Sequence, residues 1–341
     1  MVWLGVLLFL WPAVVFWKRW PEALPLPLWC FVGGILFSGW APAWWQEVGG
    51  ALGLLAMIHA LWNVPWVLTG KDVKPLVLSF ILQIFTVWLV SLLGHAWLSS
   101  EEATAYISLA RATYVGGTPV MAMASQSGGL PPQIFSMMYL ADVAASALYL
   151  PMMWWLARQW KKSSSQGIVK ETSEAHPVWF WLGIILVFGG TTLGVWLWYG
   201  RFDPLAMVVG QVMLALLLKA ILPGLRKSRS DGRPADYGFG VLFFSLGAGL
   251  DLTAFDTMPW GVWTLAFVVL FGGSVLHALL CKLFGIHRAA WAAVSMGNNM
   301  SPPFVPSILR LMGREDLTHG ATALSGLGFA VGLALALWTL W

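Results

Sequence analysis

The chain has 341 residues, of which 59% are hydrophobic and 10% are charged, and its formal net charge is +4. Soluble domains carry roughly 25% charged residues, so this composition excludes a soluble enzyme, a nucleic-acid-binding domain and a disordered chain. Long unbroken apolar runs also exclude the alternating strands of a membrane β-barrel. We therefore expect an all-α polytopic membrane protein, because a helix satisfies its own backbone hydrogen bonds in lipid.

Apolar segments follow one another along the whole chain, and most are near the ~20 residues that a crossing helix needs. They lie at 1–17, 25–41, 47–66, 74–98, 102–126, 132–158, 177–198, 203–224, 236–255, 260–284, 288–312 and 317–341. A polar linker over 161–176 divides them into two equal groups, a first half at 1–160 and a second half at 177–341. The first segment precedes Lys18-Arg19, the reverse of the order in a signal peptide, so we expect a spanning helix that begins outside.

The positions of lysine and arginine test this count of segments. Clusters of basic residues lie at 18–19, 71–74, 158–170, 226–233 and 282–288. Because cytoplasmic loops carry the excess of positive charge, these loops belong on one side. Three segments separate the second cluster from the third, so one of the three does not cross. The candidate is 102–126, where Gly116, Gly117 and Pro119 would break the helix, and we predict a re-entrant hairpin entering from outside.

A similar interruption lies in the second half of the chain. Segment 288–312 contains Asn298 and Asn299, followed by Pro302-Pro303, which cannot continue a regular helix. We predict a second hairpin, which enters from the cytoplasm. Each half then has five spanning helices plus one broken or re-entrant helix, and the odd number inverts the second half, with both termini outside. Inverted repeats with paired broken helices near the bilayer midplane are typical of secondary transporters.

The residues around both interruptions resemble a known family. The matching blocks are Ala112 to Gly117, Ala141-Asp142, Ala147-Leu148-Tyr149, Leu242 to Ala248, His277, Ser295 to Pro303, and Gly326, Gly328 and Gly332. This set resembles the bacterial and plastid integral membrane proteins grouped as domain of unknown function 819. The resemblance implies a carrier- or antiporter-like fold with inverted repeats, in the bacterial inner membrane. It implies a fold more than an activity, because the family has no established substrate.

The two broken segments supply most of the candidate binding residues. Each of these residues either is a glycine, whose backbone a ligand can approach closely, or carries a short polar side chain. They are Gly116, Gly117, Thr118, Gly297, Asn298, Asn299 and Ser301. Helix ends exposed in a low-dielectric interior attract ions, so these groups could replace the hydration shell of a sodium ion or hold a small carboxylate. The alternative is that they form tight packing turns, since small residues let membrane helices approach.

Asp142 is the most informative single residue, because it lies deep within segment 132–158. A carboxylate at that depth costs roughly 3 kcal/mol unless it is paired or hydrated. It is either a proton or cation site for coupled transport or a structural anchor for the hairpin. Three further candidates each keep more than one interpretation. Arg111 is a partner of Asp142 or an anion ligand, or it reaches the interface; Asp251 is a ligand or a helix-end residue; and His277 is a proton carrier or a packed neutral side chain.

The sequence therefore favours a secondary carrier for a small solute or anion, coupled to sodium or protons, with no resident cofactor or metal and no enzymatic activity. Its expected partners are the lipid bilayer and the solute or ion, with no nucleic acid, and a homodimer stays open. A channel or a structural membrane protein is the main alternative. An intramembrane aspartyl protease is disfavoured, because Tyr139 to Asp142 and Gly247 to Asp251 are mis-spaced for its motifs.

Overall fold

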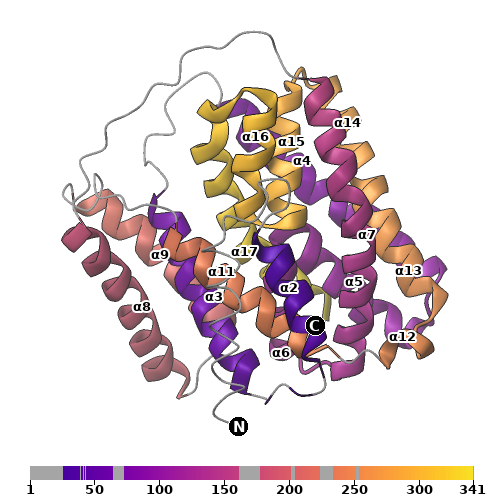
Figure 1. Cartoon of the computed structure of the whole chain (residues 1–341), viewed down its shortest axis with the longest axis horizontal. Coiled ribbons are helices and arrows are strands. Elements are labelled where there is room, and N and C mark those ends of the chain that lie inside the picture. Colours follow the sequence, from indigo (N-terminus) through magenta and orange to yellow (C-terminus); the bar gives the residue numbers. More distant parts are fainter. Residues whose placement is uncertain are drawn as a thin grey trace.

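The computed structural model describes residues 26–38, 40, 42, 44–63, 73–160, 177–200, 204–222, 233–250 and 253–340, and every regular element among them is a helix (Figure 1). The predicted all-α class is confirmed for this part of the chain. The helices are α2 (Leu26–Leu36), α3 (Trp44–Asn63), α4 (Val73–Ser91), η1 (Leu92–Ala96), α5 (Ser100–Gly116), α6 (Thr118–Ser127), α7 (Pro132–Gln159), α8 (Pro177–Tyr199), α9 (Pro204–Ile221), α11 (Arg233–Ala248), α12 (Ala254–Thr257), α13 (Trp260–Phe267), η2 (Val268–Gly272), α14 (Gly273–Leu283), α15 (Arg288–Met300), η3 (Pro302–Phe304), α16 (Val305–Met312), η4 (Glu315–Leu317) and α17 (Thr318–Leu340).

Five helical stretches of the described residues are long and apolar enough to cross a membrane, in agreement with the predicted membrane class. They are Val73–Ala96, Pro132–Gln159, Phe180–Tyr199, Trp260–Leu283 and Glu315–Leu340. The predicted first segment, 1–17, the linker 161–176 and Asp251 lie outside the described residues. α2 and α11 end at Leu36 and Ala248, earlier than the sequence predicted.

The predicted interruption in 102–126 lies at Gly117, between α5 and α6. Gly117 has φ +80° and ψ 170°, a backbone conformation that glycine adopts without steric cost. The chain reverses direction at Gly117, as contacts of both α5 and α6 with the last turns of α17 show. On α5, Ser108 donates a hydrogen bond of 2.9 Å to the carbonyl of Ala336. At the end of α6, a Cβ on Gly128 would be 2.4 Å from the Leu340 side chain. We call α5 and α6 the first hairpin.

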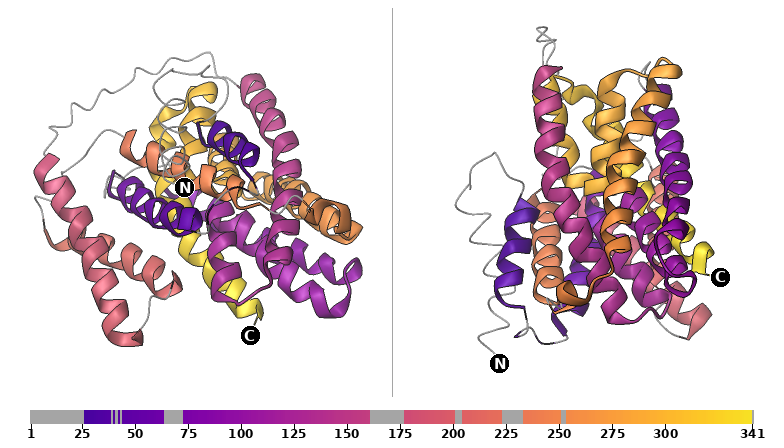
Figure 2. Two further views of the ribbon diagram at one scale, coloured as in Figure 1. Left: turned by 60° about the horizontal axis from the view of Figure 1, so that its bottom comes forward. Right: turned by 90° about the vertical axis from the view of Figure 1, so that its right-hand side faces the viewer.

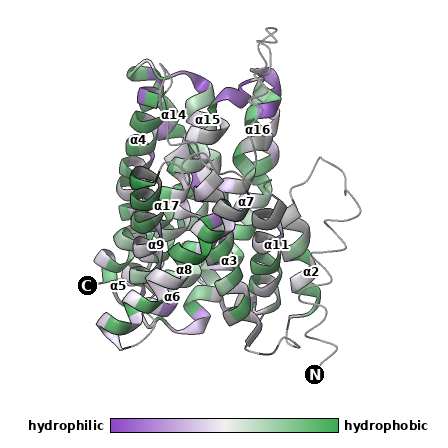
Figure 3. Ribbon diagram, turned by 90° about the vertical axis from the view of Figure 1, so that its left-hand side faces the viewer, coloured by the Kyte–Doolittle hydropathy of each residue, from purple (hydrophilic) through white to green (hydrophobic). Residues whose placement is uncertain are grey.

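The predicted interruption in 288–312 lies at Ser301, which has φ 105°. The short helix η3 follows it and leads into α16. A Cβ on Gly297 would be 2.9 Å from the Val305 side chain, although a straight helix would place residues this far apart about two turns from each other. The chain therefore folds back, and we call α15, η3 and α16 the second hairpin. Figures 1 and 3 show the two hairpins at opposite ends of the bundle.

Helix α17 runs past both hairpins and packs closely on α5. A Cβ on Gly328 would be 2.4 Å from the carbonyl oxygen of Val115, and one on Gly332 would be 2.9 Å from the amide nitrogen of Gly116. Further toward its start, the Ser325 side chain contacts Gly297 of the second hairpin. Small residues let these backbones approach, so α17 fixes the position of both hairpins.

Basic side chains gather at the end of the bundle that carries the base of the second hairpin. Arg288 lies 5.4 Å from the centre of the Trp160 ring, which joins the end of α7 to the start of α15. The basic residues that share this end are Lys74, Arg158, Lys282, Arg288, Arg310 and Arg314, and Figure 3 shows hydrophilic residues there. Glu102 and Asp256 lie at the opposite end, beside the base of the first hairpin. The basic clusters that are described thus share one end, as the positive-inside argument requires.

The remaining helices form a layer beside the hairpins. α11 packs against α2 and α3, and Phe244 on α11 stacks obliquely on Trp45 with ring centres 5.5 Å apart. α8 lies at the edge of the molecule, beyond α3 and α9 (Figures 1 and 2). Its Phe180 joins Ile58 and Trp62 of α3 in a small separate core. This layer is relevant to the cavity described below, because α11 forms one wall of that cavity.

Replacing Gly332 with alanine should lower the free energy of unfolding by about 1–3 kcal/mol, because the new methyl group would press against the Gly116 backbone. Thermal unfolding in detergent measures this loss. Gly189→Ala is the matched control, since a Cβ at that helical glycine has no atom within 4 Å. Equal stability of the two variants would contradict the close packing of α17 on α5.

Cysteine labelling should place both ends of the first hairpin on one side of the membrane. In a background with Cys30→Ala and Cys281→Ala, Ser99→Cys and Gln133→Cys should react with an impermeant maleimide from the same side, and Lys282→Cys from the other. All three positions are exposed. Reaction of Ser99→Cys and Gln133→Cys from opposite sides would mean that 102–126 crosses the bilayer.

Candidate functional site

The two hairpin tips meet inside the bundle. A Cβ built on Gly117 would lie 2.5 Å from the hydroxyl oxygen of Ser301, so the break of the first hairpin touches the break of the second. Thr118 and Ser301 are 7% and 0% exposed, respectively. The structure thus brings together residues of the two interruptions that are far apart in the sequence.

Local sequence explains why each helix stops where it does. Ser301 precedes Pro302-Pro303, and a residue before proline is disfavoured in the helical conformation. Gly117 precedes Thr118-Pro119, and Pro119 lies in the first turn of α6, where the missing N–H costs nothing. Both tips therefore result from a proline that starts a new helix after a residue with positive φ.

Two helix C-termini converge at these tips. α5 ends at Gly116 and α15 ends at Met300, so the last carbonyl oxygens of both helices lie near the contact. A helix C-terminus carries about half a negative charge. The carbonyl of Val115 lies against Gly328 of α17, and the side-chain oxygen of Asn298 would be 3.2 Å from a Cβ there. Because α6 and η3 begin at the same tips, the region offers both carbonyl oxygens and helix N-termini to a ligand.

The adjacent side chains Asn298 and Asn299 differ in their hydrogen bonds. Asn299 accepts a hydrogen bond of 2.8 Å from Gln83 and donates to Ser274 at 3.1 Å and to Tyr149 at 3.3 Å. Asn298 is 0% exposed, and neither its amide nitrogen nor its amide oxygen has a partner among the described residues. Buried polar atoms are nearly always paired, so the unpaired amide of Asn298 suggests a binding function.

Ser301 shares this property with Asn298. Its hydroxyl is buried and has no hydrogen-bond partner within the part of the chain that the structure describes. Because Ser301 touches Gly117, its free hydroxyl lies directly at the contact of the two tips. The amide of Asn298 and the hydroxyl of Ser301 are therefore the two side chains best suited to hold a ligand there.

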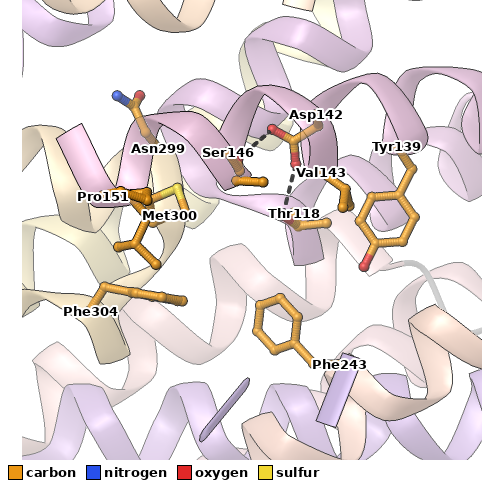
Figure 4. A pocket seen from close by; sticks show the side chains of 12 residues that line it. Thr118, Tyr139, Asp142, Val143, Ser146, Pro151, Phe243, Asn299, Met300 and Phe304 are labelled. Atoms are coloured by element: carbon orange, nitrogen blue, oxygen red, sulfur yellow. Dashed lines mark hydrogen bonds between the residues drawn. The ribbon is translucent and has the colours of Figure 1, made fainter. Parts of the chain in front are cut away.

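Asp142 of α7 lies beside the tip of the first hairpin and is 2% exposed. Its carboxylate accepts one hydrogen bond from Thr118 and one from Ser146, each 3.3 Å long (Figure 4). The phenol of Tyr114 is close to the same carboxylate but makes no hydrogen bond of standard geometry. The acid is thus tied to the first hairpin, and these bonds leave it free to bind another group.

A cavity of about 180 Å³ opens in front of Asp142. Its wall consists of Thr118 from α6, Tyr139, Asp142, Val143, Ser146, Ala147, Leu150 and Pro151 from α7, Phe243 from α11, and Asn299, Met300 and Phe304 from the second hairpin. Figure 4 shows Phe243 across the cavity from Thr118 and Asp142. The walls of the cavity therefore come from both hairpins, from α7 and from the layer that contains α11.

The secondary candidates lie elsewhere. Arg111 is 5% exposed and donates hydrogen bonds to Ser91 at 2.9 Å and to Thr339 at 2.6 Å. Its guanidinium also lies 5.9 Å from the centre of the Trp88 ring, so its contacts are with α4 and α17 rather than with Asp142. Asp251 lies outside the described residues.

His277 is fully buried and belongs to a network of polar side chains behind the second hairpin. It is hydrogen-bonded to Ser79 and to Ser295, each at 3.0 Å. Gln83 joins this network to Asn299. The members of this polar network are Ser79, Gln83, Tyr149, Ser274, His277, Ser295 and Asn299. Sequence reasoning missed the joint role of these residues, because they are scattered over four helices, α4, α7, α14 and α15, that are distant in the sequence.

Among the residues that the structure describes, no three side chains of His, Cys, Asp or Glu lie close enough together to hold a metal ion. The oxygen atoms at the tips come instead from an amide, a hydroxyl and backbone carbonyls. Such neutral ligands suit a weakly bound monovalent ion.

Comparison with known proteins gives no family for this chain: no protein-family model matches it and no curated protein is detectably similar. The resemblance to domain of unknown function 819 stays a prediction from the residues quoted above.

The two adjacent asparagines should respond oppositely to replacement by leucine, which has a similar volume. Asn299→Leu should lower the free energy of unfolding by roughly 1–3 kcal/mol or more, because it removes three buried hydrogen bonds, those with Gln83, Ser274 and Tyr149. Asn298→Leu should leave it unchanged or raise it, because an unpaired buried amide is removed. Thermal unfolding of the ligand-free protein in detergent measures both, and an equally large loss in Asn298→Leu would contradict the unpaired state.

Proposed function

We propose that this protein is a secondary transporter that couples the movement of a small solute to sodium ions or protons. The observation that carries the proposal is the meeting of two helix breaks, Gly117 and Ser301, beside a buried acid and an unpaired buried amide. Discontinuous helices that meet within the bundle form the binding sites of many secondary transporters. A structural membrane protein would gain nothing from unpaired polar atoms there.

The oxygen atoms at the tips support binding of a coupling cation. The last carbonyl oxygens of α5 and α15 lie there, and Asn298 and Ser301 have buried side-chain oxygen atoms without a partner among the described residues. Together they could replace part of the hydration shell of a sodium ion. Asp142 adds a group that can bind a proton or a cation, because a buried carboxylate gains most from neutralisation. The site therefore supplies the two components of coupled transport, an ion site and an adjacent solute cavity.

The arrangement of the hairpins supports two inverted repeats. The first hairpin belongs to the half before the linker and the second to the half after it, and they approach from opposite ends of the bundle. In this proposal the basic end faces the cytoplasm of a bacterial cell, the first hairpin is re-entrant from outside and the second from inside, with both termini outside. The fold implied by the resemblance to domain of unknown function 819 has the same plan.

A transport experiment tests the function without knowledge of the solute. Proteoliposomes receive a uniformly ¹³C-labelled mixture of bacterial metabolites, and a sodium or proton gradient is imposed across them. We expect at least one metabolite to accumulate more than about tenfold over protein-free liposomes, to saturate with concentration, and to be lost when an ionophore collapses the gradient. Mass spectrometry of the washed vesicles measures the accumulation.

Two variants separate the site from general effects of charge. Asp142→Asn should abolish the gradient-driven accumulation while the protein stays folded in the membrane, because the group that exchanges a proton or cation is gone. Asp316→Asn is the control, since Asp316 is an exposed acid at the basic end that pairs with Arg314 at 2.9 Å, and it should transport like the unmodified protein. Normal accumulation by Asp142→Asn would remove Asp142 from the mechanism, and no accumulation of any metabolite under either gradient would refute the proposed function.

A further inference from the structure

We propose that the cavity in front of Asp142 binds a small organic ammonium ion with a compact apolar body, and that this ion and a proton compete for the Asp142 carboxylate. The inference rests on the proposed transport function and names its solute class. The carrier would then exchange one amine for one proton across the membrane.

The charge of the cavity favours a cation. Asp142 is the acidic residue in its wall, and no described residue that lines the cavity is basic. The guanidinium of Arg111 is engaged by Ser91, Thr339 and Trp88. In a low-dielectric interior an unpaired carboxylate attracts a positive charge far more strongly than it would in water. For the same reason an anionic solute would be repelled, and a neutral solute would leave the charge unpaired.

The carboxylate has capacity for an ammonium group. Its hydrogen bonds from Thr118 and Ser146 are each 3.3 Å long, longer than the usual 2.5–3.0 Å of O–H···O bonds. An ionised carboxylate accepts about four hydrogen bonds, so Thr118, Ser146 and the nearby phenol of Tyr114 together still leave room for an N–H donor. An ammonium ion has N–H groups that can donate to the remaining acceptor position of the carboxylate.

The other walls favour an apolar body. Farther from Asp142 the cavity is bounded by the rings of Phe243 and Phe304 and by Met300, while Tyr139 lies beside the acid on α7 (Figure 4). The polar side chain at that side, Asn299, already has partners in the polar network. A bare metal ion would find too few oxygen ligands there, whereas aromatic faces stabilise organic ammonium ions through cation–π attraction. Polar and apolar surfaces are thus separated, as they are in an amine with one ring or a short branched chain.

The volume limits the size of the solute. The cavity of about 180 Å³ is slightly larger than the ~150 Å³ apolar cavity that holds a benzene molecule. A ring or chain of about six carbon atoms together with one ammonium group therefore fits in it.

One carboxylate that binds either a proton or an ammonium ion produces exchange. When the protonated acid meets the ammonium ion, the O–H bond of Asp142 breaks, the carboxylate forms an ion pair with that ion, and the proton leaves to water on the side from which the ammonium ion entered. Charge balances, because one cation enters as one leaves. On the other side a proton displaces the amine, so a proton gradient would drive the amine in the opposite direction.

Three probes of nearly equal shape test the solute class: benzylammonium, benzyl alcohol and benzoate. Isothermal titration calorimetry of the full-length protein in detergent, in buffers of different ionisation enthalpy, reports affinity and proton release together. We expect benzylammonium to bind, with a proton release that approaches one per amine as the pH is lowered. We expect benzyl alcohol and benzoate to bind at least about tenfold more weakly and to release no proton.

Variants connect the binding to the cavity. Asp142→Asn should weaken benzylammonium at least about tenfold and abolish the proton release, while Asp316→Asn should do neither. Phe243→Ala gives a second test that does not alter the acid, since it should weaken benzylammonium more than methylammonium, which has no ring to contact that wall. Equal losses for the two amines in Phe243→Ala would overturn the orientation proposed here.

The remaining outcomes distinguish this inference from the proposed function. Failure of benzylammonium to bind, or binding of benzoate or benzyl alcohol as tight as that of benzylammonium, would overturn the amine assignment, while gradient-driven accumulation of another metabolite in proteoliposomes would still support transport. Conversely, benzylammonium binding with proton release, but without gradient-driven uptake of any solute, would support the cation site and refute the transport function.

Discussion

The contact between Gly117 and Ser301 is the constraint on which the rest of the site depends. Each helix break leaves backbone N–H and C=O groups without helical partners, and a bundle surrounded by lipid must satisfy or use them internally. The two breaks come together because α17 carries small residues where it passes both tips, with Gly328 against α5 and Ser325 against α15. Close packing of three backbones thus concentrates exposed helix ends at one place.

Around this contact, fully hydrogen-bonded polar side chains lie next to polar side chains without hydrogen-bond partners. The polar network fixes the second hairpin to α4, α7 and α14 through Asn299, and a fully paired buried network specifies one arrangement. One residue earlier, Asn298 has no partner within the described chain. The free energy that the network contributes offsets the cost of leaving Asn298 and Ser301 unpaired, so binding groups are held ready in a stable frame.

The cavity joins this frame to a different part of the molecule. Asp142 and Thr118 connect α7 to the first hairpin, Met300 and Phe304 belong to the second hairpin, and Phe243 comes from α11 in the neighbouring layer. The acid and the ring that faces it are therefore carried by two different helices, α7 and α11, and in the proposed function a solute held between them would contact both.

The sequence by itself determined the elements that local chemistry controls. Composition gave the membrane class, segment 132–158 predicted α7 to within one residue, and glycine and proline predicted both helix breaks, because backbone geometry at those residues is a local property. Only the tertiary structure decided which of two adjacent asparagines is paired, that Arg111 faces Ser91 and Thr339 instead of Asp142, and that Phe243 closes the cavity. Those outcomes depend on contacts between helices distant in sequence, and apolar segments of similar composition do not encode which neighbours they meet.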